Sequence, residues 1–307
     1  MNKSTLAVAV VVLAGAGYVG ANYYVNEQVK QEITKQISSF EQQSGLTVSF
    51  ANSSVDLFSR GVEITDLTIS QPDEKITLFT IDKLNIVGYE QDKISPYTEL
   101  DLVGLKLAKE AAEFTQGMSP ELVNATYHLK TSLAYDDASG ASEVKFATSA
   151  EGIVKTSFNA AFGNSKAFMD ASLAASKIQG DTPNLEQELQ VQSQMMTAMQ
   201  SLELKSLAVN IDNAGTLPQF IEAELAQQGM TKDDFEAVTA QQLMYSPMPQ
   251  ELKDAITGFV SGMESLSISV TVPQSQNVMA LGQQLSLAMA QNPETLSELI
   301  KINASGK

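Results

Sequence analysis

The chain has 307 residues, of which 43% are hydrophobic, and its 36 acidic against 19 basic residues give a formal net charge of −17 at pH 7. This balance argues against nucleic acid as a partner, because binding a polyanion relies on clustered Lys and Arg, and it also disfavours anionic membrane surfaces. The absence of cysteine excludes disulfides, thiolate metal sites and cysteine nucleophiles, while the length allows one large domain or two small ones.

The first predicted element is an apolar helix over residues 5–21, TLAVAVVVLAGAGYVGA, which carries no charge. About 20 apolar residues cross the hydrocarbon core of a bilayer, and the tyrosines that follow extend the run to that length. We therefore predict a transmembrane signal anchor over residues 1–25, with Lys3 on the cytoplasmic side. The anchor residues are Leu6, Val10, Val11, Val12, Leu13, Tyr18, Val19, Tyr23 and Tyr24.

A cleaved signal peptide is the alternative interpretation of the same run. Val19 and Ala21 are small residues at the positions that a signal peptidase requires before Asn22. In both cases the rest of the chain lies outside the cytoplasm. Residues 26–44 follow with apolar side chains at spacings of three and four, which predicts a helical stalk.

A strand-rich region is predicted over residues 45–180, and one template recurs: two alternating apolar residues, two spacer residues, then two more alternating apolar residues. It occurs at Val62–Ile69, Leu100–Leu107 and Leu202–Val209, with a looser copy at Ile76–Ile86. The spacer moves the apolar side chains from one face of the pleat to the other, which a β-bulge or a tight kink achieves within one strand. This predicts a curved sheet with an apolar inner face. Chance patterning in the short strands of an antiparallel sandwich is the alternative.

A β-hairpin is the clearest local prediction in this region. Residues 127–135 alternate between apolar and polar, the turn sequence DDASGAS follows, and residues 143–162 supply the partner. Residues 168–178 are predicted to form a further strand.

Residues 181–307 are predicted to mix strand and helix, as a second domain or as a further layer of the first. Helices are expected from Pro183, Pro218, Thr231, Pro249, about Gln276 and Pro293, with strands over 202–209 and 264–272 and a short tail at 301–307. The predicted fold class is α+β: an N-terminal transmembrane helix and helical stalk, then a curved, mainly antiparallel β-sheet with amphipathic helices covering one face in the second half.

Residue types that carry catalysis are sparse, so we predict no enzyme, no catalytic or metal-binding residue and no cofactor. The one histidine, His128, falls on the polar face of its strand and is expected at the surface. Asp136 and Asp137 belong to a turn, and Asp233 and Asp234 begin a helix, where negative charge is favourable.

Methionines are concentrated in the helix-rich half. Flexible thioethers suit an adaptable apolar surface, such as a lipid or peptide groove, and they also suit an ordinary core. Both interpretations remain open.

The order of apolar helix, polar helical segment and the sequence GLTVSFANSSVDLFSRGVEITDLTISQP, residues 45–72, resembles AsmA-like bacterial envelope proteins and the YdgA-like group. The resemblance extends over about residues 1–110. It implies a single-pass protein of the bacterial inner membrane with the bulk of the chain in the periplasm. For the AsmA-like branch it also implies that lipid is handled along an apolar groove.

From these patterns we expect an inner-membrane-anchored periplasmic protein of envelope maintenance that binds lipid or another apolar ligand without catalysis. The expected partners are the membrane and a lipid or an envelope protein. The alternative function is a periplasmic protein-interaction or scaffold module of YdgA-like type with no small ligand. An open sheet lined by Leu, Ile and Val would favour the first, and an exposed helical face around Phe259 and Val260 would favour the second.

Overall fold

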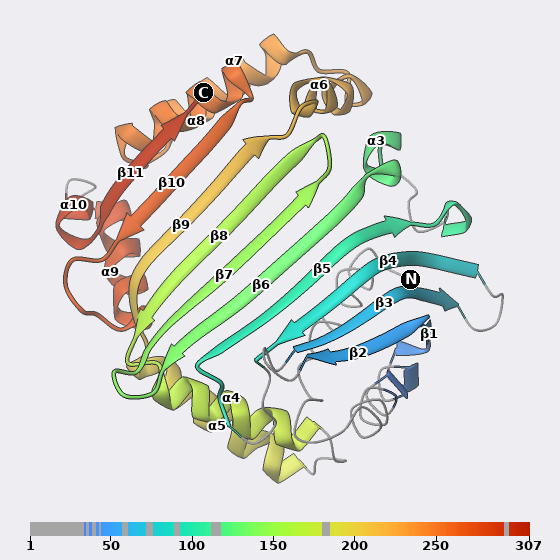
Figure 1. The fold of residues 1–307 in the computed structure, drawn as a ribbon. Helices are drawn as coiled ribbons and strands as arrows, with labels where there is room; N and C mark the ends of the chain where they lie inside the picture. Colours follow the sequence, from blue (N-terminus) through green and yellow to red (C-terminus); the bar gives the residue numbers. More distant parts are fainter. Residues whose placement is uncertain are drawn as a thin grey trace. The chain divides into compact units, whose positions relative to one another are not determined.

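The structure, a computed structural model, describes residues 34, 37, 38, 41, 42, 44–56, 61–71, 76–88, 93–111, 118–179, 185–291 and 295–307. It divides into two compact units, Met1–Tyr135 and Asp136–Lys307, here the N-terminal and the C-terminal unit. Both are built on antiparallel strands (Figure 1). The predicted anchor residues, from Leu6 to Tyr24, lie outside the described residues.

The N-terminal unit is a twisted antiparallel sheet in the order β1-β3-β4-β5-β6, with β2 also pairing to β3. Two short helices, η2 (Lys109–Ala111) and α3 (Pro120–Asn124), lie between β5 and β6 in the sequence. The strands are β1 (Thr47–Ser49), β2 (Asn52–Asp56), β3 (Gly61–Gln71), β4 (Ile76–Val87), β5 (Tyr97–Leu107) and β6 (Thr126–Asp136).

The C-terminal unit is also antiparallel, in the order β7-β8-β9-β10-β11. Its strands are β7 (Ala141–Ala150), β8 (Val154–Gly163), β9 (Glu203–Asn213), β10 (Ser265–Thr271) and β11 (Lys301–Gly306). The partner that the sequence predicts over residues 143–162 as one strand of the hairpin is therefore two strands, β7 and β8, joined by a short turn.

Helices fill the connections between the last four strands. They are α4 (Lys166–Gln179) and α5 (Leu185–Ser201) before β9, α6 (Leu217–Gln227), α7 (Lys232–Tyr245) and α8 (Gln250–Gly262) before β10, and α9 (Val278–Gln291) and α10 (Leu296–Leu299) before β11. Because neighbouring strands are antiparallel, α4, α5, α9 and α10 lie at one end of the strands, and α6, α7 and α8 lie at the other (Figure 1).

Three copies of the repeated template contain the predicted bulge or kink at the spacer. Asp66 in β3 and Gly104 in β5 take positive φ angles of 54° and 73° within the spacers, and Lys205 in β9 is an extra residue opposite β8. The predicted change of face is wrong. The two apolar residues that flank each spacer are three positions apart, which would place them on opposite faces of a regular strand, but the kink returns both to the same face. The residues on both sides of the spacers share one buried core in the N-terminal unit: Val62, Ile64, Leu67, Ile69, Phe79, Ile81, Leu84, Ile86, Leu100, Leu102 and Leu105.

The predicted fold class is wrong. In the described ranges, no helix is both long enough and apolar enough to cross a bilayer. The helices of the second half join strand ends, and only part of the sheet face is covered, as shown below. The predicted stalk is helical at its described positions, but Ile37 packs on the core of the N-terminal unit and the carboxylate of Glu41 accepts a hydrogen bond from the Val48 amide at 2.8 Å.

Two local predictions in the second half are also wrong. Residues 168–178 belong to helix α4, in which four alanines supply high helix propensity. The predicted tail is strand β11, in which Ile302 pairs with Val270 and Ala304 with Ile268. A six-residue strand at a sheet edge needs its partner in order to form.

Candidate functional site

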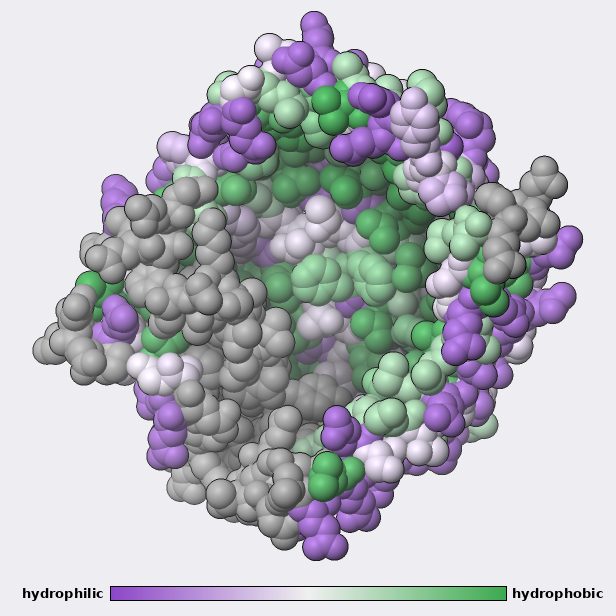
Figure 2. Space-filling view, turned by 180° about the vertical axis from the view of Figure 1, so that it is seen from behind, coloured by the Kyte–Doolittle hydropathy of each residue, from purple (hydrophilic) through white to green (hydrophobic). Residues whose placement is uncertain are grey.

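The strand registers sort the side chains of the C-terminal sheet into one apolar and one polar face. One row crosses all five strands as Phe146, Phe158, Val209, Ile268 and Ala304. The row beside it contains Val144, Ala160, Leu207, Val270 and Ile302, and the row on its other side contains Thr148, Thr156, Ile211, Leu266 and Gly306. These three rows are hereafter the apolar face. Figure 2 shows hydrophobic residues gathered on the side of the strands turned away from the viewer in Figure 1.

The apolar face is only partly covered. Phe146 and Phe158 are 37% and 36% exposed, and Ala160 is the one residue of the three rows that is fully buried. Residues of the same kind in the core of the N-terminal unit, such as Ile69 and Leu78, have no exposed surface. Large contiguous apolar surface is rare on proteins without a binding role.

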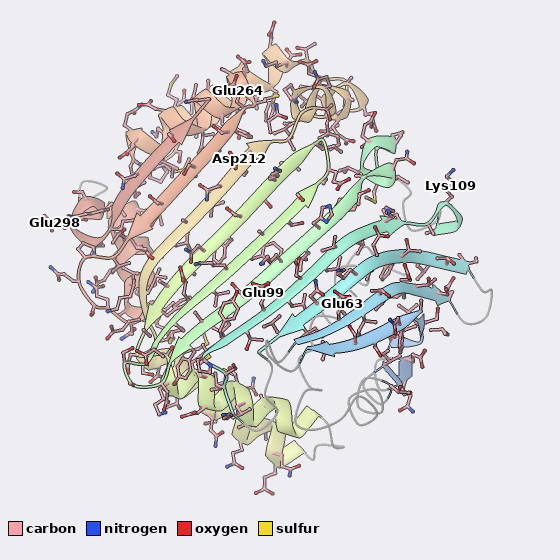
Figure 3. All side chains as sticks on the ribbon, viewed as in Figure 1. Glu63, Glu99, Lys109, Asp212, Glu264 and Glu298 are labelled. Carbon is pink, nitrogen blue, oxygen red and sulfur yellow. The ribbon has the colours of Figure 1, made fainter. Side chains whose placement is uncertain are left out.

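The polar face carries short hydroxyl and amide side chains that bond to one another. The Asn210 amide donates to Ser157 Oγ at 3.0 Å, and Ser267 Oγ donates to Asn210 Oδ1 at 2.7 Å. Figure 3 shows the side chains of this sheet, with Asp212 of β9 labelled. Asp212 lies in the same register set as Asn210 and is exposed. These groups are solvated or mutually satisfied, so the two faces offer different chemistry.

Helix α8 covers the β11 end of the apolar face. It packs against β11 and β10, and a Cβ atom on Gly306, which belongs to the apolar face, would lie 1.8 Å from the Ala255 carbonyl oxygen. Ala255 is 3% exposed at this close approach, and Phe259 is half-buried. Val260 is 8% exposed and lines a hollow together with Ala237 and Ala240 of α7. On β7 and β8, Phe146 and Phe158 of the apolar face stay exposed.

Apolar side chains are also exposed on helices at one end of this sheet. Helix α5 packs against α9, and the two present Leu189, Met196, Met199, Met279, Leu287 and Met289 at 40% to 60% exposure. Met169 and Met263 are buried. Methionines of this chain therefore serve both as core and as surface.

The titratable residues singled out in the sequence have local structural roles. His128 is half-buried, where the sequence predicted a surface position, and its Nδ1 accepts a hydrogen bond at 3.3 Å from the Gly104 amide that the kink of β5 displaces. Hydrogen bonds from Ser139 and the Ala138 amide lower the pKa of Asp136 in the β6–β7 turn. Asp137 pairs with Lys166.

Asp234 completes a capping box at the start of α7, as predicted. Its carboxylate accepts hydrogen bonds from the Thr231 hydroxyl and amide, which lower its pKa. Nowhere in the described ranges do three His, Asp or Glu side chains gather as metal ligands would. In the described part of the chain, the partly exposed apolar face is therefore the main candidate site.

Sequence reasoning missed this site as a set of residues. The alternation within residues 202–209 and 264–272 predicts strands, without showing that they share a face. Membership of one face depends on register across β7–β11, which brings together residues up to about 160 positions apart, such as Val144 and Ile302.

The fold and the site define an antiparallel sheet protein with a one-sided apolar surface. A family model described as "Uncharacterized protein" matches residues 147–307, which is more than half of the chain, so the chain belongs to that family. Residues 1–62 are similar to a second family, described as "Bacterial protein of unknown function (DUF945)". The search of curated proteins found no match.

Proposed function

We propose that this protein is a non-catalytic binding protein of the bacterial envelope that holds the acyl chains of a lipid against the apolar face. The observation that supports it is the contrast in burial between the two sheets. The N-terminal sheet packs its apolar residues into a closed core, whereas the apolar face of the C-terminal sheet keeps Phe146 and Phe158 more than a third exposed.

The chemistry of the apolar face selects a hydrocarbon ligand. Its rows contain aliphatic, aromatic and small side chains with two threonines and no ionisable group. A charged or polar ligand would lose its hydration there without a compensating partner. Burial of each CH₂ group contributes about 0.8 kcal/mol, so a long acyl chain gains on the order of 10 kcal/mol before the cost of its ordering.

The proposal includes the periplasm as the location and the YdgA-like group as the family. The similarity of residues 1–62 to a bacterial family supports a bacterial source, and the resemblance over residues 1–110 supports the envelope. The docking face that the scaffold alternative requires is largely covered, because Val260 is 8% exposed and Phe259 is half-buried.

Two adjacent residues of β7 provide a matched test. Phe146 belongs to the apolar face, while Ala147 is exposed on the polar face. Phe146→Asp and Ala147→Asp add the same charge to the same strand, and Phe146→Asp costs more strand propensity because Phe is the better strand former. Binding of a fluorescent long-chain fatty acid to the full chain is measured for both variants and the parent.

We expect Phe146→Asp to weaken fatty-acid binding at least tenfold, and Ala147→Asp to bind as the parent does. Circular dichroism and the urea midpoint verify that both variants are folded. Equal binding by the two variants, or no binding by the parent, would refute the proposal. Native mass spectrometry of detergent-free protein supplies a second readout, in which a lipid adduct is expected for the parent and lost in Phe146→Asp.

A further inference from the structure

A hydroxyl group lies at the end of the apolar face where β8 leads to α4. Ser142 of β7 lies two positions before Val144, and side chains two positions apart on a strand point to the same side. Its neighbours across the sheet are Phe162 of β8 and Leu204 of β9. Ser142, Phe162 and Leu204 are hereafter the end row. The end row therefore continues the apolar face and adds one hydroxyl group to it.

Ser142 differs from the other buried polar residues in its hydrogen bonding. It is 5% exposed, and within the described residues no group forms a hydrogen bond with its Oγ atom. Every other buried polar residue in that part of the chain has a hydrogen bond to a backbone group: Ser95, Thr98, Ser119 and Ser165. A buried hydroxyl without a partner lowers stability, and such groups are rare in native proteins. The place of Ser142 on the apolar face indicates that its partner is a ligand of that face.

The kind of partner follows from what the end row offers. Its three side chains supply one neutral hydroxyl and no positive charge. A carboxylate or a phosphate would be costly to bury there, because an ion in an apolar site needs an opposite charge or several donors. The carbonyl oxygen of an acyl ester is neutral, and a single donor satisfies it. The end row thus fits an ester carbonyl better than an ionised headgroup.

The path from Ser142 along β7 has the length of a long acyl chain. Val144 and Phe146 follow on the apolar face, and the next residue of that face is Thr148, which pairs with Thr156 of β8. At about 3.4 Å per residue, the six steps from Ser142 to Thr148 span about 20 Å. Val144 is half-buried and Phe146 is 37% exposed. A chain that starts at Ser142 therefore runs over open apolar surface before polar side chains return.

We propose that Ser142 donates a hydrogen bond to the carbonyl oxygen of an acyl ester and so holds the acyl chain along β7, over Val144 and Phe146. This assignment rests on the proposed function, and it adds the ligand class and the direction of the chain. Neighbouring side chains close the hydroxyl to water, so an entering acyl chain moves them aside in order to reach it. The carboxylate of a free fatty acid stays outside the end row, in water.

Two buried serines provide a matched pair of variants. Ser142→Ala removes a hydroxyl that has no partner in the described part of the chain, whereas Ser165→Ala removes one that donates to the Gly140 carbonyl oxygen at 2.9 Å. Three pyrene probes share one alkyl chain and end in a methyl group, a methyl ester or a carboxylate: dodecylpyrene, methyl pyrenedodecanoate and pyrenedodecanoic acid. Fluorescence titration of the full chain gives the dissociation constant for each probe, and urea unfolding gives the midpoint of each variant.

The parent is expected to bind the ester about threefold to tenfold more tightly than the hydrocarbon, which is the gain from one neutral hydrogen bond. Ser142→Ala should abolish this preference and leave the affinities for the hydrocarbon and the acid unchanged, without lowering the urea midpoint. Ser165→Ala should keep the preference and lower the midpoint, because the Gly140 carbonyl oxygen loses a donor.

The assignment of Ser142 is overturned if the parent shows no preference for the ester, if Ser142→Ala keeps the preference, if it weakens all three probes equally, or if it weakens only the acid. A urea midpoint lowered as much as in Ser165→Ala would also overturn it, because the hydroxyl would then have a structural partner. Failure of the proposed function gives a different result, in which the parent binds none of the three probes, and the assignment of Ser142 then fails with it.

Discussion

Helix α8 and strand β11 approach so closely that glycine is required on both sides of the contact. A Cβ atom on Gly258 would lie 2.5 Å from the Gly306 carbonyl oxygen. That oxygen belongs to the backbone of a paired strand, so no side-chain rotation can relieve the overlap. Gly258→Ala is therefore expected to destabilise the C-terminal unit, although alanine is the better helix former.

The size of the effect follows from the displacement that the methyl group forces. Ordinary van der Waals contact of a Cβ atom begins at 3.4 Å. Helix α8 must therefore move away from β11 until the distance from the new Cβ atom to the Gly306 carbonyl oxygen increases from 2.5 Å to about that value. A gap approaching 1 Å forfeits a quarter to a half of the dispersion energy across a contact. The residue at risk is Ala255, which lies against Gly306 and is 3% exposed.

Overpacking of a well-packed core costs about 1–3 kcal/mol, occasionally more, and the gain in helix propensity offsets about 1 kcal/mol of it. We therefore expect Gly258→Ala to lower the free energy of unfolding by up to about 2 kcal/mol.

The matched control is Gly282→Ala in α9, because a Cβ atom there meets nothing within 4 Å. It is expected to raise the free energy of unfolding by about 0.5–1 kcal/mol. Both variants are compared with the parent by urea unfolding, with the midpoint interpreted only where the slope is unchanged. If Gly258→Ala stabilises the protein as much as Gly282→Ala does, the reasoning about close packing is refuted.

Three further predictions concern local contacts. His128→Ala is expected to lower the free energy of unfolding by about 1 kcal/mol, because the Gly104 amide loses its acceptor; an unchanged urea midpoint would contradict this role. Thr231→Ala removes the capping box of α7 and is expected to cost about 1 kcal/mol, whereas a loss below about 0.3 kcal/mol would show that water replaces the cap. Burial raises the pKa of Glu99, but hydrogen bonds from Lys130 and Tyr97 outweigh burial and hold the pKa below its usual value. A depressed carboxyl pKa stabilises the fold above the unfolded value of about 4.3 and ceases to do so as pH falls through the folded value. Lys130→Met should therefore raise the Glu99 pKa, measured by NMR titration, and its stability deficit at pH 7 should shrink below pH 4; a deficit independent of pH would contradict the pairing.

Local signals in the sequence were sufficient wherever the physical cause is itself local. The capping box at Thr231 and Asp234 satisfies helix-end amides within four residues, so it marks the start of α7 without any tertiary contact. The two-residue spacers indicated kinks for a similar reason. Apolar residues three positions apart can point into the same core only if the regular pleat is interrupted between them. Gly104 in particular offers the positive φ angle that such a kink uses.

The secondary structure of the edge strand β11 and of the connecting helix α4 depends on the elements that pack against them. Residues 168–178 alternate well enough for a strand, yet they form α4, whose residues Met169 and Ala171 are buried. Residues 301–306 have too little apolar content to predict a strand, and they form β11 because β10 offers a ladder of backbone hydrogen bonds to pair with. The predicted anchor over residues 1–25, its cleavage after Ala21 and the periplasmic location stay predictions.

The candidate site shows most clearly the limit of local patterns. Ile69 in β3 and Val209 in β9 occupy equivalent final positions of the repeated template, so the sequence assigns both to an apolar face. Ile69 is fully buried in a closed core, whereas Val209 lies half-buried in the apolar face. Alternation determines which side of a strand is apolar, because the pleat has a period of two. Whether that side is covered depends on the segments that pack over it, and these come from distant parts of the chain, as α8 comes to lie on β11.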